Sequence, residues 1–165
     1  REVEAPADVG AVVDEVLAFL APECRRRGIT VHYERAREAT LVHGGRDRLF
    51  QVFFNLVHNA AQIQPEGGAI EVDLSAAILR EEPAVRISIA DRGPGIPPHL
   101  AAHIFEAFVT TREHEGGTGL GLTIVDGLVR ELDGTIEAHN RPNGGAVFVC
   151  TLPTWPTPEA KEVPS

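Results

Sequence analysis

The sequence has few cysteines, few basic residues and no long apolar run, and each shortage excludes a class of protein. Its two cysteines, Cys24 and Cys150, stand far apart and lack the spacing of a zinc site or a disulfide framework, which favours buried, reduced thiols. The net charge of −9 argues against general binding to nucleic acid, because phosphate contacts need clustered Lys and Arg. No stretch approaches the roughly 18 consecutive apolar residues of a membrane span. We therefore expect no nucleic-acid partner and no direct membrane contact.

Methionine is absent from all 165 residues, and the chain opens on Arg1 in the middle of a pattern. We expect the chain to be a piece of a larger protein. A hydrophobic content of 43% at this length is enough for one domain with a substantial core and too little for two. After Pro153 the prolines are too dense for a packed element. We therefore expect one domain over residues 1–153 and a disordered, proline-rich tail over 154–165.

Apolar periodicity predicts three main helices and six short strands. The helices are expected over 8–27, about 47–63 and about 118–132, with Asp8 as the first N-cap and Gly28 as the first stop. The strands are expected over 30–33, 40–42, 69–74, 85–90, 135–139 and 146–152, with a connection at 81–83. The polar stretch 109–117 ends in glycines and predicts a mobile loop. This alternation indicates an α/β fold, a two-layer sandwich with the helices on one face of a mixed sheet.

Three carboxamides share one face of the second helix. Asn55 and Asn59 lie four residues apart, about 40° around the helix axis, with Gln62 beside them. Carboxamide oxygens are hard, neutral ligands that suit Mg²⁺, which keeps several waters and takes its other ligands from substrate phosphates. Asn59 is the first choice of metal ligand and Asn55 the second. Because a lone NxxxN spacing more often marks a solvated face, the prediction depends on the segments that follow.

A carboxylate follows a buried strand and precedes a flexible turn. By period-two alternation, Asp91 points to the same apolar interior as Ile87 and Ile89. An unpaired buried carboxylate is costly, and an adenine amino group would satisfy it, whereas guanine would present a carbonyl there. Gly93 and Gly95 would then let the backbone approach a flat ring. The segment therefore predicts selection of adenine, although DxGxG alone is more often only a turn.

The segment GGTGLGL at 116–122 ends a loop and begins a helix. Backbone N–H groups and the positive end of the helix dipole can meet phosphate oxygens there, and Gly117, Gly119 and Gly121 allow close contact. No Lys follows the glycines, so this is not a Walker loop, and the spacing is not the dinucleotide GxGxxG fingerprint. With the two preceding segments it predicts a pocket for a magnesium-bound adenine nucleotide.

Together these segments resemble the catalytic and ATP-binding domain of sensor histidine kinases, in the Bergerat-fold superfamily that also holds gyrase, mismatch-repair ATPases and a heat-shock chaperone. The resemblance covers about residues 5–153. DRLFQVFFNLVHNAAQ at 47–62 looks like the asparagine box, DRGPGI at 91–96 like the first glycine box, IFEAF at 104–108 like the phenylalanine box, and GTGLGL at 117–122 like the second glycine box. The TTR at 110–112 is similar to kinases of the nitrogen-regulation type.

The resemblance implies a Bergerat ATP-binding fold with a mobile ATP lid, and it implies ATP and Mg²⁺ as cofactors. Asp91 would select adenine, Asn59 would hold Mg²⁺, and Arg112 would be a basic lid residue near the phosphates. The nucleotide-binding residues implied are Asn55, Asn59, Gln62, Ile63, Asp91, Gly93, Gly95, Ile96, Phe105, Phe108, Thr110, Thr111, Arg112, Gly117, Thr118, Gly119, Leu120, Gly121 and Leu122.

One position separates the branches of the superfamily. Hydrolysing members carry a Glu one turn before the metal-binding Asn, where this sequence has Asn55. An amide cannot accept a proton from water, so efficient intrinsic ATP hydrolysis is not expected. The resemblance instead implies transfer of the γ-phosphoryl group to a histidine on a dimerisation hairpin domain of the same parent protein, which this sequence lacks. It also implies a response regulator receiver domain as partner, and a cytoplasmic domain whose parent can be anchored in a membrane.

Three positions depart from the family pattern. Gln62 stands where many members have a phosphate-contacting Lys, Ile63 where an aromatic residue often flanks the adenine, and Ala146 where a hydroxyl residue often helps to hold it through water. Tight nucleotide affinity is therefore not expected. Two alternatives stay open: a serine/threonine protein kinase of the anti-sigma-factor type, and a non-catalytic docking module with a degenerate nucleotide pocket.

Overall fold

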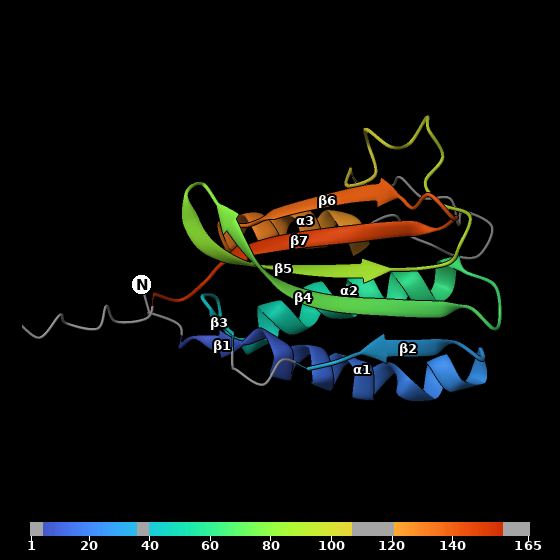
Figure 1. The fold of residues 1–165 in the computed structure, drawn as a ribbon, viewed down its shortest axis with the longest axis horizontal. Coiled ribbons are helices and arrows are strands. Elements are labelled where there is room, and N and C mark those ends of the chain that lie inside the picture. Colours follow the sequence, from blue (N-terminus) through green and yellow to red (C-terminus); the bar gives the residue numbers. More distant parts are fainter. Residues whose placement is uncertain (1–4, 36–39, 107–120, 157–165) are drawn as a thin grey trace, which may run out of the picture.

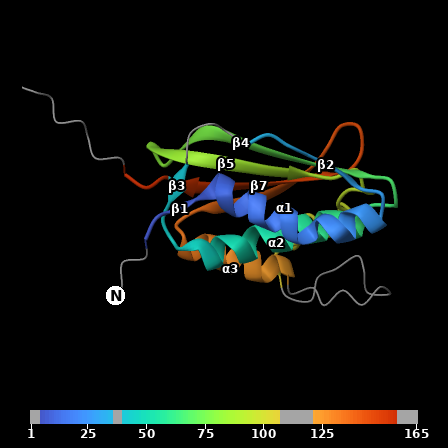
Figure 2. The same cartoon turned by 90° about the horizontal axis from the view of Figure 1, so that it is seen from below.

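The structure is a computed structural model, and it describes residues 5–35, 40–106 and 121–156. Its elements form two layers, with the helices on one face of a five-stranded sheet (Figures 1 and 2). This arrangement confirms the predicted α/β sandwich. The predicted lid at 109–117 and the predicted start of the third helix at 118 lie outside the described residues.

The first helix, α1 (Val9–Arg26), begins and ends where its local chemistry predicts. Asp8 Oδ1 accepts a hydrogen bond of 3.0 Å from the Gly10 N–H, which caps the helix. Gly28 has a φ of +64°, the left-handed conformation that ends many helices. The side chains that face the core recur at helical spacing and include Val9, Val12, Val13, Val16 and Leu20.

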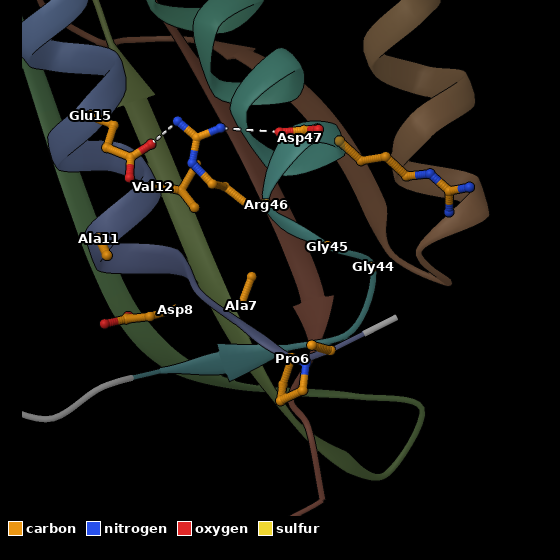
Figure 3. Close-up of a pocket in the computed structure, with 12 residues that line it drawn as sticks. Pro6, Ala7, Asp8, Ala11, Val12, Glu15, Gly44, Gly45, Arg46 and Asp47 are labelled. Atoms are coloured by element: carbon orange, nitrogen blue, oxygen red, sulfur yellow. Dashed lines mark hydrogen bonds and ion pairs between the residues drawn. The ribbon is translucent and has the colours of Figure 1, made fainter. Parts of the chain in front are cut away.

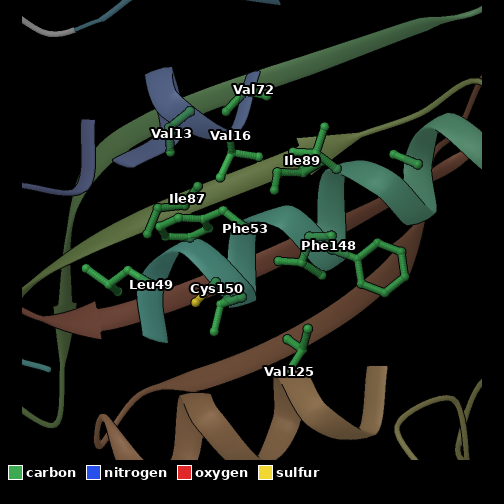
Figure 4. Close-up of a cluster of buried hydrophobic side chains, with 14 of the residues drawn as sticks. Val13, Val16, Leu49, Phe53, Val72, Ile87, Ile89, Val125, Phe148 and Cys150 are labelled. Carbon is green, nitrogen blue, oxygen red and sulfur yellow. The ribbon is translucent and has the colours of Figure 1, made fainter. Parts of the chain in front are cut away.

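The second helix, α2 (Arg46–Ile63), lies between α1 and α3 (Gly121–Glu131), as Figure 2 shows. Its apolar stripe is fully buried and consists of Leu49, Val52, Phe53, Leu56, Val57 and Ala60. This stripe packs in one cluster with Ile87, Ile89, Phe148 and Cys150 from the sheet (Figure 4). Each such side chain contributes about 1.5–3 kcal/mol when fully buried, so α2 is the helix that anchors the two layers. None of the described helices is long and apolar enough to cross a membrane.

The main sheet has the strand order β2-β4-β5-β7-β6. β2 (Thr30–Tyr33) runs parallel to β4, and the remaining neighbours are antiparallel, so the sheet is mixed as predicted. β6 (Thr135–Asn140) and β7 (Ala146–Pro153) form a hairpin along one edge. This order brings the C-terminal end of β5 next to the turn between β6 and β7 (Figure 1).

The central hairpin is longer than the sequence indicates. β4 (Ala69–Leu79) and β5 (Glu82–Ala90) pair as far as Leu79 with Glu82, whereas the sequence predicts strands over 69–74 and 85–90. The predicted connection at 81–83 is wrong, because the turn consists of Arg80 and Glu81, with φ values of +48° and +67°. Two non-glycine residues with positive φ give no local sequence signal of a tight hairpin turn.

A second, small sheet joins the two ends of the described chain. β1 (Ala7–Asp8), which the sequence does not predict, pairs antiparallel with β3 (Leu41–Val42). On the other side of β3, Thr154 forms a bridge with Val42, and the Trp155 N–H donates to the Leu41 carbonyl at 2.7 Å. We call β1, β3 and residues 154–155 the terminal ribbon. The chain therefore stays bonded to the fold just beyond Pro153, and residues 157–165 of the predicted tail lie outside the described residues.

Both cysteines are free and buried, as the sequence predicts. Cys24 is 3% exposed and Cys150 is 0% exposed. Burial raises the pKa of the Cys150 thiol to about 12, and burial also raises the pKa of Cys24. Neither thiol is ionised at neutral pH, so both act as small apolar core residues.

Candidate functional site

The second half of α2 carries the predicted polar stripe. Asn55, Asn59 and Gln62 are partly exposed and lie on one side of α2, next to the edge of its apolar stripe. Asn55 Nδ2 donates a long hydrogen bond of 3.4 Å to the carbonyl of Gly121, the first residue of α3. The Gln62 amide nitrogen lies 3.1 Å from His58 Nε2. The stripe therefore faces the point where the second glycine-rich segment passes into α3.

Asp91 lies in the interior, as its strand register predicts. It is 1% exposed and continues the buried side of β5 that Ile87 and Ile89 form. Its Oδ1 accepts hydrogen bonds from the Gly93 N–H at 2.8 Å and from the Ala146 N–H at 3.2 Å. One carboxylate oxygen is thus fixed by the backbone on both sides.

The second oxygen of Asp91 has a different environment. Oδ2 accepts no hydrogen bond from any described residue. In the described part of the chain, every side-chain oxygen or nitrogen that is fully buried has a hydrogen-bond partner. Oδ2 therefore lies where solvent or a ligand can reach it, which is the position expected of an acceptor for an adenine amino group.

Two opposing effects act on the ionisation of Asp91. Burial is the largest and raises the pKa of the carboxyl group, because the charged form loses hydration. Hydrogen bonds from Gly93 and Ala146 and the positive charge of Arg141 lower the pKa and partly offset burial. A donor from a ligand would favour the charged form further.

A buried glutamine that the sequence reasoning missed connects α2 to the loop that follows Asp91. Gln64 is 5% exposed, and its Oε1 accepts from the Ala69 N–H at 3.0 Å and from the Arg92 N–H at 3.2 Å. Its Nε2 donates to the Ala60 carbonyl at 3.0 Å, which satisfies one of the last carbonyls of α2. The order PEGG after this helix signals only a turn, so no local pattern reveals the contact with Arg92.

The glycines of the site fall into two groups. A Cβ on Gly93 would lie 3.1 Å from the Ile63 carbonyl, and one on Gly95, whose φ is +82°, would lie 2.7 Å from Asn140 Oδ1. The conformation and packing of the protein itself require glycine at position 95 and leave little room for a side chain at position 93, whereas the sequence assigns both glycines to a close approach of the base. A Cβ on Gly121 would meet no atom of the described residues within 4 Å.

The predicted phenylalanine box begins next to the start of α3. The ring of Phe105 packs edge-on against Phe148, with 6.3 Å between ring centroids. The Phe105 carbonyl accepts a hydrogen bond of 3.0 Å from Thr123 Oγ1. Ile96 is 9% exposed, and Leu122 is partly buried against the core. Described residues on either side of 107–120 are thus bonded to one another and packed against the core.

Eight predicted binding residues have no structural description here. They are Phe108, Thr110, Thr111, Arg112, Gly117, Thr118, Gly119 and Leu120, which lie outside the described residues. Among the remaining predicted residues, the contacts above join Asn55 to Gly121 and Ile63 to Gly93, and they join Asp91 to the start of β7.

Residues 44–156 match the family described as histidine kinase-, DNA gyrase B- and HSP90-like ATPases, which is more than half of the chain. The chain belongs to this family. The catalytic domain of histidine kinase ThkA superimposes with a TM-score of 0.79 at 32% identity, covering 93% of this chain and 96% of that one. The structural resemblance identifies this ATPase-family member as a histidine kinase catalytic domain, which confirms the resemblance drawn from the four boxes.

Two further relatives are much longer than this chain. Sporulation kinase A of Bacillus subtilis is 31% identical over 142 residues, which are 86% of this chain and 22% of that protein. The structure of ThkA in complex with the response regulator protein TrrA matches with a TM-score of 0.74 at 29% identity, over 92% of this chain and 42% of that one. The chain therefore spans about a fifth of the curated relative and under half of the larger ThkA chain.

The donor set of this kinase-type domain fits a hydrated magnesium ion rather than a protein cage. Across residues 5–35, 40–106 and 121–156, no three His, Cys, Asp or Glu side chains gather as a metal site. The metal ligands that the sequence predicts on α2, Asn59 and Asn55, carry neutral amide oxygens. Such a set suits Mg²⁺ that keeps its waters and takes further ligands from phosphates.

A pocket of about 480 Å³ lies at the opposite end of α2 from these residues. Its lining includes Pro6, Ala7 and Val12 on one side and Gly44 to Arg48 on the other (Figure 3). Arg46 forms ion pairs with Glu15 and Asp47 beside it. Thirteen residues of helix separate Arg46 from Asn59, a distance of about 20 Å at 1.5 Å per residue. This pocket is therefore separate from the candidate nucleotide site of the ATPase-family fold.

Proposed function

We propose that this domain binds ATP with Mg²⁺ and transfers the γ-phosphoryl group to a histidine on a dimerisation hairpin domain of the same parent protein. The observation that carries the proposal is Asp91, a buried carboxylate with Oδ1 held by two backbone N–H groups and Oδ2 accessible. An adenine amino group would donate to Oδ2, and the fixed carboxylate would orient the base. Guanine would place a carbonyl against the same oxygen, so the site favours adenine.

The residues of α2 would hold the phosphate end of the nucleotide. Asn59, with Asn55, would supply amide oxygens to Mg²⁺, which neutralises phosphate charge when bound. A glycine at position 121, where a Cβ would meet no described atom within 4 Å, would allow phosphates to lie close to the backbone of this segment. Catalysis would rest on positioning and charge neutralisation, with the imidazole nitrogen forming the new P–N bond as ADP leaves.

The family position of Asn55 supports transfer rather than hydrolysis. An amide cannot take a proton from an attacking water, so the domain lacks the general base that the hydrolysing branch uses. The serine/threonine kinase and docking-module alternatives are not favoured, because the similar proteins include the histidine kinase ThkA and a sensory histidine kinase of Azospirillum brasilense. The nitrogen-regulation subtype rests on residues 110–112 and stays a prediction from the sequence.

A response regulator receiver domain is the further partner that we propose. The ThkA catalytic domain belongs to a kinase whose structure was solved with a response regulator, and this chain shares its fold. Because ATP and response regulators occur inside the cell, the proposal places the domain in the cytoplasm.

The test is a phosphoryl-transfer assay with γ-labelled ATP, Mg²⁺ and the separately produced hairpin domain of the parent protein. We expect acid-labile label on the hairpin histidine and little inorganic phosphate. Release of the label as inorganic phosphate, with none on the hairpin, would contradict the proposal and indicate a hydrolase. A non-hydrolysable ATP analogue that fails to bind the native domain at millimolar concentration would overturn it altogether.

A further inference from the structure

The turn between β6 and β7 lies over the loop that contains the first glycine box. Asn140, the last residue of β6, bonds both backbone groups of Ile96: its Oδ1 accepts from the Ile96 N–H at 2.6 Å, and its Nδ2 donates to the Ile96 carbonyl at 3.1 Å. One carboxamide thus satisfies one residue's donor and acceptor together, in the manner of a strand neighbour. This contact joins positions that are 44 residues apart in the chain.

The same turn holds the beginning of that loop. Arg141 Nη1 donates to the Asp91 carbonyl at 3.0 Å, and Arg141 Nη2 lies 3.0 Å from Glu71 Oε2 on β4. The Asp91 N–H donates to the Ala146 carbonyl at 2.9 Å. Asn140 therefore holds the far end of the loop while Arg141 and Ala146 hold the near end.

The loop between these two points needs such restraint. Its middle is Gly93, Pro94 and Gly95, and glycine has the largest choice of backbone conformations of any residue. Gly95 has a φ of +82°, and its Cα approaches Asn140 so closely that a Cβ would lie 2.7 Å from Oδ1. The side chain of Asn140 and the conformation of Gly95 are thus fitted to each other.

We infer that Asn140 is a positioning residue for nucleotide binding, which acts by fixing Ile96 and the end of the loop relative to Asp91. The inference rests on the proposed function, because it concerns the same base pocket. A loop that is already ordered loses no further conformational entropy when the nucleotide binds. A loop that is ordered for only part of the time lowers the apparent affinity in proportion to the fraction of molecules that are competent to bind. Asn140 itself need not touch the nucleotide.

The test compares Asn140→Leu, Asn140→Asp and the control Asn143→Ala. Leu removes both hydrogen bonds at similar size, whereas Asp keeps the acceptor and loses the donor. Asn143 lies in the same turn, is exposed, and makes no side-chain hydrogen bond with a described residue. The dissociation constant of a non-hydrolysable ATP analogue is measured by calorimetry for each. We expect it to rise roughly 5- to 30-fold for Asn140→Leu and not at all for Asn143→Ala; Asn140→Asp should also raise it, because its second oxygen would face the Ile96 carbonyl.

A second measurement needs no nucleotide. The short hydrogen bond from the Ile96 N–H predicts a downfield amide proton in the NMR spectrum of the unliganded domain, and Asn140→Leu should move it upfield while Asn140→Asp retains it. A general loss of stability would not reproduce this pattern. An Ile96 amide unchanged by Asn140→Leu, or an affinity within twofold of native, would overturn the inference. Failure of the proposed function is distinguishable, because it shows as absence of binding by the native domain.

Discussion

At its C-terminal end, α2 passes into Gln64, whose buried side chain bonds the backbone of α2, β4 and the loop after Asp91. At its N-terminal end the helix has Gly45 as N-cap, which supplies no side-chain hydrogen bond, and Arg46 forms exposed ion pairs with Glu15 and Asp47 there. The first end is fixed by groups withdrawn from water. The N-terminal end is held by charged groups that remain exposed to water.

The difference shows why hollowness alone does not locate a binding site. The N-terminal end has a pocket of about 480 Å³, yet its charged side chains pair with one another. The C-terminal end has Asp91, a buried acid with one oxygen left to a ligand. A buried carboxylate with one hydrogen-bonded oxygen and one oxygen without a described donor is therefore a more specific sign of function than an open volume.

The largest expected effect is a loss of nucleotide affinity when Asp91, near the C-terminal end of α2, is changed. Asp91→Asn replaces the acceptor at Oδ2 by an amide and should weaken binding of a non-hydrolysable ATP analogue roughly 10- to 150-fold, as expected for a hydrogen bond to a charged group. Asp73→Asn, which changes an exposed acid on β4, is the matched control and should bind as the native domain does. Equal affinities of all three proteins in a calorimetric titration would remove Asp91 from the site.

The next effect concerns the stability of the folded domain. Gln64→Leu leaves the N–H groups of Ala69 and Arg92 without their acceptor, and we expect it to lower the free energy of unfolding by about 2–4 kcal/mol. Urea unfolding followed by circular dichroism measures the change. A loss below about 0.5 kcal/mol would mean that water replaces the glutamine at no cost.

Asp91 should also give the domain a characteristic pH dependence. Burial raises the pKa of its carboxyl group in the folded state, so the folded protein holds this proton more strongly than the unfolded chain. The contribution of Asp91 to stability is therefore present below the unfolded pKa of about 3.9 and is lost as pH rises through the raised folded value.

The pH effect is measured as a difference between two proteins. Urea unfolding of the native domain and of Asp91→Asn from pH 4 to pH 7 cancels the other carboxyl groups. We expect Asp91→Asn to become relatively more stable as pH rises, even though it binds the nucleotide less well. The opposite trend would show that the hydrogen bonds from Gly93 and Ala146 outweigh burial.

The smallest effect is expected at the other end of α2. Arg46→Ala removes ion pairs to Glu15 and Asp47, which lie in water, where such pairs contribute little. Its free energy of unfolding should fall by only a small fraction of the loss expected for Gln64→Leu. Its nucleotide affinity should equal that of the native domain. A large loss of affinity in this variant would instead link the pocket to the site.

The sequence predicts the helices well because their signals are local. Asp8 caps α1 and Gly28 ends it through groups a few residues away, and the register that buries Ile87 and Ile89 also buries Asp91. The same reasoning fails for the turn at Arg80 and Glu81, because neither residue type favours positive φ.

Contacts between distant positions escape such reasoning. Gln64 meets Arg92 across 28 residues, and Asn140 meets Ile96 across 44, so neither leaves a pattern within any short window. The sequence assigns Gly95 to the ligand, whereas the structure shows that its positive φ and its proximity to Asn140 already require glycine. Local chemistry thus predicted the burial of Asp91 but not the residues that hold its loop.

The terminal ribbon has a mechanical consequence. β3 lies between β1 and Thr154, so residues 7–8 and residues 154–155 pair with the same short strand from opposite sides. Tension applied between these two stretches would load the few hydrogen bonds of Leu41 and Val42 before it reached the five-stranded sheet. The ribbon thus links residues 7–8 to residues 154–155 through β3, apart from the hydrogen bonds of the five-stranded sheet.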